Sequence, residues 1–149
     1  MENEIRELMG RTIEFPSGYV AVPSSAAHEM EVLLSKPLKV VTYVDEMQSC
    51  NECTLNALKE CYKQISLMDK EHVAYIVVFC CDDLKKLQSV VEKAGVSFPI
   101  ICYQTDVFKA VNELDVLACN RTFLIDEDSR IILVGEPFDY RRKNIQVLS

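Results

Sequence analysis

The sequence lacks the features that would assign it to a nucleic-acid-binding or membrane-spanning class. Its 16 Lys and Arg residues are outnumbered by 23 Asp and Glu residues, and its one short basic run is Arg141-Arg142-Lys143. A phosphate backbone requires clustered cations, so we expect no nucleic-acid partner. No apolar run approaches the ~20 residues that a membrane-spanning helix needs, so we expect no membrane span.

Glycine and histidine are also scarce, which removes two common pointers to a site. Only four glycines are present, and none of them belongs to a phosphate-binding loop. The two histidines, His28 and His72, have no motif around them, and we expect both at the surface. Neither residue type therefore indicates a functional site.

Cysteine, by contrast, is abundant. Seven cysteines are present, and an odd number leaves at least one thiol outside any intramolecular pairing. Several unpaired thiols would be a hazard in a strongly oxidising compartment. The count by itself therefore favours the cytoplasm, or an envelope that is not strongly oxidising.

Strands and helices alternate along the chain, whose 149 residues are enough for one domain with a sizeable core. Expected strands cover residues 12–15, 18–22, 38–44, 72–79, 98–103, 121–125 and 130–134, and expected helices cover 26–34, 50–68, 82–93, 106–114 and 140–148. This order implies a largely parallel sheet with helices on both faces, closed by an antiparallel hairpin. We therefore predict a single α/β domain over residues 1–149 with a central mixed sheet, in which residues 1–36 form an N-terminal extension.

Helix ends carry recognisable signals in three places. Ser24 and Ser25 precede the first expected helix and should cap it. The Asp82-Asp83 pair is better interpreted as the cap of helix 82–93 than as a catalytic pair. Gly95 follows that helix and should end it.

The chemistry of the chain centres on Cys50-Asn51-Glu52-Cys53, which follows a buried strand and opens an amphipathic helix. Cysteines three positions apart on a helix lie on the same side, within disulfide reach. Unpaired N–H groups and the helix dipole favour a thiolate at the first position, and the thiolate is the attacking species in disulfide exchange. We predict that Cys50 is the nucleophile and Cys53 the resolving thiol. Glu52 adds negative charge that opposes the Cys50 thiolate.

Two other interpretations of this motif stay open. A lone Cys-x-x-C can be half of a zinc site, or a structural disulfide in a non-catalytic binding module. Cys61 falls on the inner stripe of the helix, and Cys102 closes a short strand; we expect both to pack in the core. Cys80 and Cys81 end a strand, so their side chains should point to opposite faces of the sheet.

Three sequence segments resemble those of a known family and occur in this order: LMGRTIEFPSG, LKVVTYVDEMQSCNEC and RTFLIDEDSRIILVGEP. Together they are similar to the thioredoxin superfamily, and most of all to the thioredoxin-like and redoxin-like thiol–disulfide oxidoreductases of anaerobic bacteria, over about residues 8–138. The resemblance implies a thioredoxin fold, that is, a three-layer α/β/α sandwich. It also implies a protein disulfide or dithiol partner and no cofactor. Members of this family are often lipid-anchored in the cell envelope. The resemblance therefore implies the cell envelope or periplasm for this chain, with a lipid anchor on a removed N-terminal segment as one form of attachment, and the cytoplasm is the alternative.

The sequence departs from the family at the loop that faces the Cys pair. The family has a cis-proline there, and this chain has Asn120. A cis bond before a non-proline residue costs about 3–4 kcal/mol, so we expect a trans bond. The resemblance assigns Cys119, Asn120 and Arg121 to a substrate-binding loop, with Cys119 either an ordinary loop cysteine or a third thiol that exchanges with Cys50 or completes a metal site. We expect no bound metal.

Peroxide reduction is disfavoured by the same comparison. The peroxide-reducing branch of the superfamily uses Thr-x-x-Cys with a facing Arg. Here Met47 stands three residues before Cys50, and Asn120 takes the place of the Arg.

Overall fold

The structure, a computed structural model, describes residues 8–45, 52–67, 71–81, 83–104, 107–114 and 121–135. Within these ranges the strands are β1 (Val20–Val22), β2 (Leu38–Asp45), β3 (Val73–Cys80), β4 (Ile100–Tyr103), β5 (Arg121–Ile125) and β6 (Ile131–Gly135). The helices are α2 (Ala27–Leu34), α4 (Glu52–Ser66), α5 (Leu84–Ala94) and α6 (Val107–Val111), preceded by the 3-10 turn η1 (Ser24–Ala26). The expected helix over residues 140–148 lies outside the described residues.

The strands form one six-stranded sheet in the order β1-β4-β3-β2-β5-β6. β2, β3 and β4 run parallel to one another, as expected for strands joined through helices. β1 pairs antiparallel with β4, and β5 pairs antiparallel with β2. β6 folds back on β5 as the predicted hairpin. The prediction of a mixed sheet is confirmed.

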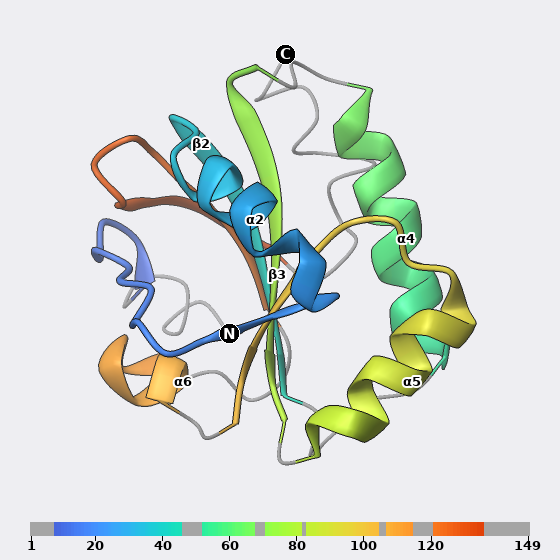
Figure 1. The fold of residues 1–149 in the computed structure, drawn as a ribbon. Helices are drawn as coiled ribbons and strands as arrows, with labels where there is room; N and C mark the ends of the chain where they lie inside the picture. The colour runs from blue at the N-terminus through green and yellow to red at the C-terminus, as the bar shows by residue number, and fades with distance from the viewer. Residues whose placement is uncertain are drawn as a thin grey trace.

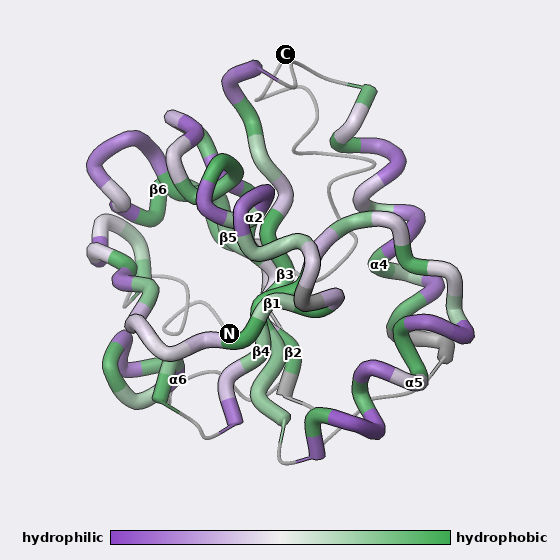
Figure 2. The backbone as a smooth tube through the Cα atoms, viewed as in Figure 1, coloured by the Kyte–Doolittle hydropathy of each residue, from purple (hydrophilic) through white to green (hydrophobic). Residues whose placement is uncertain are grey.

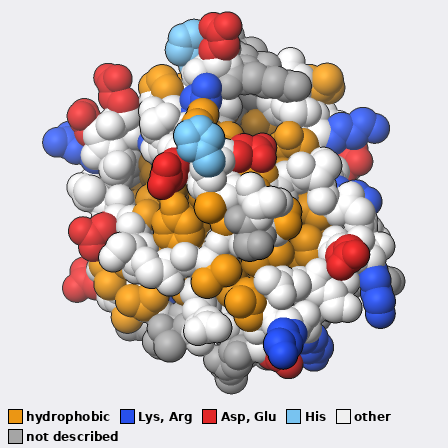
Figure 3. All heavy atoms as spheres, viewed as in Figure 1, with side chains coloured by type: hydrophobic (Ala, Val, Ile, Leu, Met, Phe, Trp, Pro, Cys, Tyr) orange, Lys and Arg blue, Asp and Glu red, His pale blue; other side chains and the backbone are white. Residues whose placement is uncertain are grey.

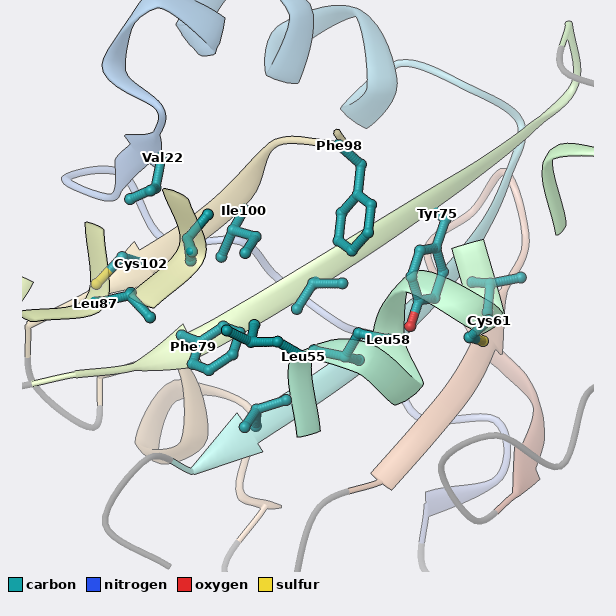
Figure 4. Close-up of a cluster of buried hydrophobic side chains, with 14 of the residues drawn as sticks. Val22, Leu55, Leu58, Cys61, Tyr75, Phe79, Leu87, Phe98, Ile100 and Cys102 are labelled. Carbon is teal, nitrogen blue, oxygen red and sulfur yellow. The ribbon is translucent and has the colours of Figure 1, made fainter. Parts of the chain in front are cut away.

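Helices cover both faces of this sheet (Figure 1). α4 and α5 lie against one face, where Leu55, Leu58 and Leu87 are fully buried (Figure 4). On the other face, Met30 of α2 and Phe108 of α6 join a second apolar cluster. β3 is buried on both faces for most of its length, as its unbroken apolar sequence indicates. The predicted three-layer α/β/α arrangement is confirmed.

The distribution of hydrophobic and charged residues agrees with this arrangement. Figure 2 shows hydrophobic residues concentrated on the strands, whereas α5 alternates between hydrophilic and hydrophobic positions. On the face shown in Figure 3, described Lys and Arg side chains lie close to Asp and Glu around the rim. This face therefore carries mixed charge rather than a basic patch.

The lead-in differs from its sequence prediction in one respect. Residues 12–15 form no strand; only Thr12 makes a β-bridge, to Arg130. The reason is that Glu14 uses its backbone N–H and C=O on the side-chain amide of Asn112, at 2.7 and 2.8 Å, and not on a neighbouring strand. The expected strand over residues 18–22 is present as the shorter β1.

Of the three predicted helix-end signals, two are confirmed within the described residues. Asp83 is the N-cap of α5, and its side chain accepts a hydrogen bond from the Lys86 N–H at 3.1 Å; Asp82 lies outside the described residues. Gly95 ends α5 in the left-handed conformation, with φ at 68°. The predicted serine cap is wrong, because Ser24 and Ser25 belong to η1. The N-cap of α2 is Ala26, with no side-chain cap bond.

Candidate functional site

One edge of the sheet brings together the chain segments that adjoin the Cys-x-x-C motif. The carboxyl ends of the parallel strands meet there, since Asp45 of β2 is paired with Cys80 of β3, and Cys80 with Tyr103 of β4. β5 runs the opposite way and starts at this edge, with Arg121 paired to Tyr43. In α/β folds, sites form outside the carboxyl ends of parallel strands. We call this the thiol edge.

The structure places the predicted site residues at this edge as far as it describes them. Glu52 is the first residue of α4, Cys53 is the second, and Arg121 is the first residue of β5. Cys50, Cys119 and Asn120 lie outside the described residues. α4 follows β2 along the chain, and the first residue of β5 is paired with Tyr43 near the carboxyl end of β2.

α4 is positioned by its buried stripe. Leu58, Cys61 and Ile65 are buried against the sheet, as the helical spacing predicts. The stripe that the helical spacing predicts consists of Ala57, Leu58, Cys61, Tyr62, Ile65 and Met68. It leaves out Leu55, which is also fully buried and stands three positions before Leu58, so its spacing could have identified it. Ala57, by contrast, is only half-buried. The core contacts of α4 therefore begin within one turn of Cys53.

The other described cysteines are packing residues. Cys80 belongs to the apolar cluster under α2, and Cys81 to the cluster under α4, so the two side chains point to opposite faces as predicted. The Cys81 thiol donates to the Asp83 carbonyl at 3.1 Å and is 1% exposed. Cys61 and Cys102 are buried in the cluster under α4, which confirms their predicted core roles.

A buried polar chain crosses the centre of the sheet, and no pattern in the sequence predicted it. The Thr42 hydroxyl lies 2.9 Å from the Thr122 hydroxyl and 3.0 Å from the Tyr75 hydroxyl. Thr42, Thr122 and Tyr75 belong to β2, β5 and β3, respectively. These hydrogen bonds therefore link three strands whose ends form the thiol edge. The only indication of these hydrogen bonds in the sequence is the presence of a threonine in each of two apolar strands.

On the face of the sheet that α2 and α6 cover, aromatic rings pack next to the thiol edge. Tyr43 and Tyr103 each stack on Phe108, with ring centroids 5.7 and 5.8 Å apart. The Tyr103 hydroxyl donates to the Pro16 carbonyl at 2.8 Å. Burial, together with the neighbouring Tyr19, raises the pKa of Tyr103 well above its ordinary value. Tyr103 is therefore a neutral hydrogen-bond donor that attaches the lead-in to the sheet.

Among the residues that the structure describes, no group of three His, Cys, Asp or Glu side chains is arranged to hold a metal ion. Two of the three cysteines that a zinc site would use, Cys50 and Cys119, lie outside these residues. His28 and His72 are both exposed, as predicted. None of the helices in the described ranges is both long and apolar enough to cross a membrane.

Comparison with known proteins supports the fold through structure rather than sequence. No family model matches the chain, and no curated protein matches it by sequence. A thioredoxin-like protein solved in its oxidised form superposes with a TM-score of 0.66 at 10% identity, over 95% of this chain and 96% of that one. A proposed protein disulfide isomerase from Bacteroides thetaiotaomicron gives 0.62 at 16% identity, over 93% and 85%. The thioredoxin domain of a thiol-disulfide oxidoreductase from Bacteroides vulgatus gives 0.58 at 13% identity, over 77% and 81%.

These likenesses extend over most of each chain, and all three matches share one architecture. The chain has the thioredoxin fold, as the resemblance implied.

Proposed function

We propose that this chain is a thiol–disulfide oxidoreductase in which Cys50 is the nucleophile and Cys53 the resolving thiol. The observation that carries the proposal is that α4 begins inside the Cys-x-x-C motif, at Glu52, and follows the carboxyl end of the parallel strand β2. A helix start at this position supplies unpaired N–H groups that stabilise a nearby thiolate. The thioredoxin fold places its Cys pair at such a junction.

The reaction consists of two exchanges. The Cys50 thiolate attacks one sulfur of a protein disulfide, forms a mixed disulfide with it, and releases the other sulfur as a thiolate. The Cys53 thiolate then attacks the Cys50 sulfur, forms the Cys50–Cys53 disulfide, and releases the second substrate thiolate. The substrate gains two electrons, and its two sulfurs take up protons from solvent. Another dithiol protein returns the pair to its reduced form, so no cofactor is needed.

The partner and the setting follow from the same proposal. Arg121 begins β5 beside Tyr43, so the residues before it, Cys119 and Asn120, are proposed to contact the substrate next to the nucleophile. Structural neighbours named as thiol-disulfide oxidoreductases come from bacteria, and one neighbour from Corynebacterium diphtheriae is a DsbF homologue. We propose protein disulfides as substrates, the cell envelope as the setting, and one domain for the whole chain.

The direct test is the reaction of the reduced protein with an aromatic disulfide reagent. Wild type should form a mixed disulfide quickly and then release it, as the pair closes. Cys53→Ser should stop at the mixed disulfide, which mass spectrometry detects, and Cys50→Ser should not form it. Cys81→Ala, at a buried cysteine, is the matched control and should behave as wild type.

Two results would contradict the proposal. A Cys50→Ser variant that reacts as fast as wild type would exclude Cys50 as the nucleophile. A stoichiometric zinc ion that is lost on replacing Cys50, Cys53 or Cys119 would favour a metal-binding module instead, and elemental analysis of the purified protein measures it.

A further inference from the structure

A cavity lies between α4 and the segment that joins α5 to β4. Its volume is about 260 Å³, just below the range of about 300–1,000 Å³ that is usual for small-molecule sites, so its occupant must be small. The described residues that line it are Lys59, Tyr62, Lys63, Ser66, Ser97 and Phe98. The first four belong to α4, and the last two to the segment that Figure 1 shows crossing beside α4 on its way to β4.

This cavity lies away from the thiol edge. α4 starts within the Cys-x-x-C motif, and the cavity uses this helix only from its middle onward, over residues 59–66. Ser97 and Phe98 precede β4, which begins at Ile100, so they lie at the amino end of the parallel strands. The cavity is therefore separate from the proposed exchange site, and a ligand bound in it does not depend on the proposed function.

Two stacked aromatic rings line the cavity. The ring centroids of Tyr62 and Phe98 are 4.7 Å apart, with an interplanar angle of 29°. Phe98 is buried, and its ring also packs edge-on against that of Tyr75 in the core, with centroids 5.8 Å apart (Figure 4). Tyr62 is partly exposed. The flat ring of a ligand can extend this aromatic cluster, because ring pairs gain more than the area that they bury.

Two lysines give the cavity a positive charge. The Lys59 Nζ donates to the carbonyl of Ala94, the last residue of α5, at 2.7 Å. This bond fixes the position of the ammonium group and leaves it further N–H donors, because a lysine has three. Lys63 stands one helical turn further along α4 and is exposed.

The remaining polar groups suit an anion as well. None of the described residues that line the cavity is Asp or Glu, although the whole chain has a net charge of −7. Ser97 is exposed, and its hydroxyl can donate to the same anion as the lysines. Two cations and a hydroxyl with no lining carboxylate make a local site for negative charge on an acidic protein.

We propose that this cavity binds a small aromatic carboxylate. The ring of the ligand packs against Tyr62 and Phe98, and its carboxylate accepts hydrogen bonds from Lys59 and Lys63. A simple inorganic anion would make no use of the aromatic lining, and a neutral ring would make no use of the ammonium groups. A flat ring that carries one acid group satisfies both.

The test titrates 1-naphthoate, a flat aromatic carboxylate, into the full chain and follows the backbone amide chemical shifts. The amides of residues 59–66 and 96–98 should shift, and those of residues 77–80, at the carboxyl end of β3, should not. Lys63→Gln should weaken binding at least about fivefold, because it removes a charge-assisted hydrogen bond. Lys63 is exposed, so its replacement leaves the core unchanged.

The matched control is Lys85→Gln, which removes the same charge from an exposed position outside the cavity. Lys85 is in the first turn of α5, nine residues before Ala94 and thus ~14 Å away along the helix axis. Its replacement should change the affinity for 1-naphthoate less than about twofold, because salt screens exposed charges at such a separation.

Three other probes separate the two parts of the ligand. 1-Naphthalenemethanol keeps the flat ring without the charge, cyclohexanecarboxylate keeps the charge without the flat ring, and inorganic phosphate has a charge and no ring. Each should bind at least about fivefold more weakly than 1-naphthoate, because each loses one of the two interactions.

Three results would overturn the proposal. They are amide shifts that miss residues 59–66 and 96–98, equal weakening by Lys63→Gln and Lys85→Gln, and phosphate binding as tight as that of 1-naphthoate. None of these measurements involves Cys50. The proposed disulfide exchange therefore stands or falls by its own test.

Discussion

The hydroxyls of Thr42 and Thr122 lie 2.9 Å apart in the buried centre of the sheet. They are directly paired residues on β2 and β5, two of the strands whose ends form the thiol edge. Because Thr42 also lies 3.0 Å from the Tyr75 hydroxyl, it is the middle member of the chain and its loss affects two partners.

We therefore expect Thr42→Val to lower the free energy of unfolding by about 1–3 kcal/mol, the usual cost of leaving a buried polar group without a bond. Thr122→Val should cost about 1 kcal/mol, because Thr42 keeps Tyr75. The double variant should be more stable than the sum of the two losses predicts, since neither hydroxyl is then stranded. Urea denaturation measures all three.

The control is Thr12→Val, an exposed threonine, which should stay within about 0.5 kcal/mol of wild type. Additive losses at Thr42 and Thr122 would show that the 2.9 Å contact contributes no coupling.

Tyr103 should make stability depend on alkaline pH. Its pKa is raised, chiefly by burial, above the ordinary tyrosine value of about 10. Above that pH the unfolded chain loses a proton that the folded chain keeps, so the free energy of unfolding falls as pH rises. Lys39 acts in the opposite direction, because burial lowers its pKa and the folded chain loses that proton first.

Tyr103→Phe removes the first contribution and leaves the second. It should cost about 1 kcal/mol at neutral pH through the lost bond to Pro16, and its free energy of unfolding should fall less than that of wild type above about pH 10. Urea denaturation across this range, with Tyr62→Phe on the opposite face as control, measures the difference. Parallel pH profiles for wild type and Tyr103→Phe would contradict the prediction.

Local sequence signals predicted the fold well because they reflect periodicity and caps. The apolar run of β3 and the Asp83 cap of α5 need only neighbouring residues to be recognised. The contact between Glu14 and Asn112 joins residues 98 positions apart, and nothing near either residue indicates it. That contact also explains why residues 12–15 do not form the predicted strand.

The order of strand and helix around the Cys-x-x-C motif was predictable in the same way. The Cys-x-x-C spacing after a buried strand located the start of α4, because the strand-to-helix order determines which edge it occupies. The hydrogen bonds from Arg11 to the Asn112 and Glu113 carbonyls could not be predicted, because these carbonyls lie just past the end of α6, 101 and 102 positions further along the chain.

The two thiols of the motif should differ in reactivity. Cys53 is the second residue of α4 and stands two positions before Leu55, where the fully buried stripe of this helix begins, whereas Cys50 precedes the described helix. We expect iodoacetamide to modify Cys50 first in the reduced protein, since an exposed thiol at a helix start ionises and reacts more readily. Peptide mapping over time measures the order. Faster modification of Cys53 would reverse the assigned roles.

Glu52 should modulate Cys50. It is the first residue of α4, and its negative charge opposes the dipole at the helix start. Glu52→Gln should lower the pKa of the Cys50 thiol, followed through the ultraviolet absorbance of the thiolate, and make the pair a stronger oxidant. Glu60→Gln, at an exposed position two turns further along α4, is the control and should leave both properties unchanged. An unchanged or higher pKa in Glu52→Gln would contradict this role.

Asn120 should make this chain differ from the family it resembles, because that family has a cis-proline at this position. Asparagine keeps a backbone N–H and strongly prefers a trans bond. The substrate-binding loop beside Cys50 should therefore have a different shape from that of a general disulfide reductase. Insulin reduction should therefore be slow, while Cys50 still reacts with a small disulfide. Asn120→Pro should raise insulin turnover if the loop accepts the cis form, and Asn120→Ala is the control that removes the side chain and keeps the trans preference. An experimental structure that shows a trans bond before Asn120, together with rapid insulin turnover by wild type, would refute this account of the loop.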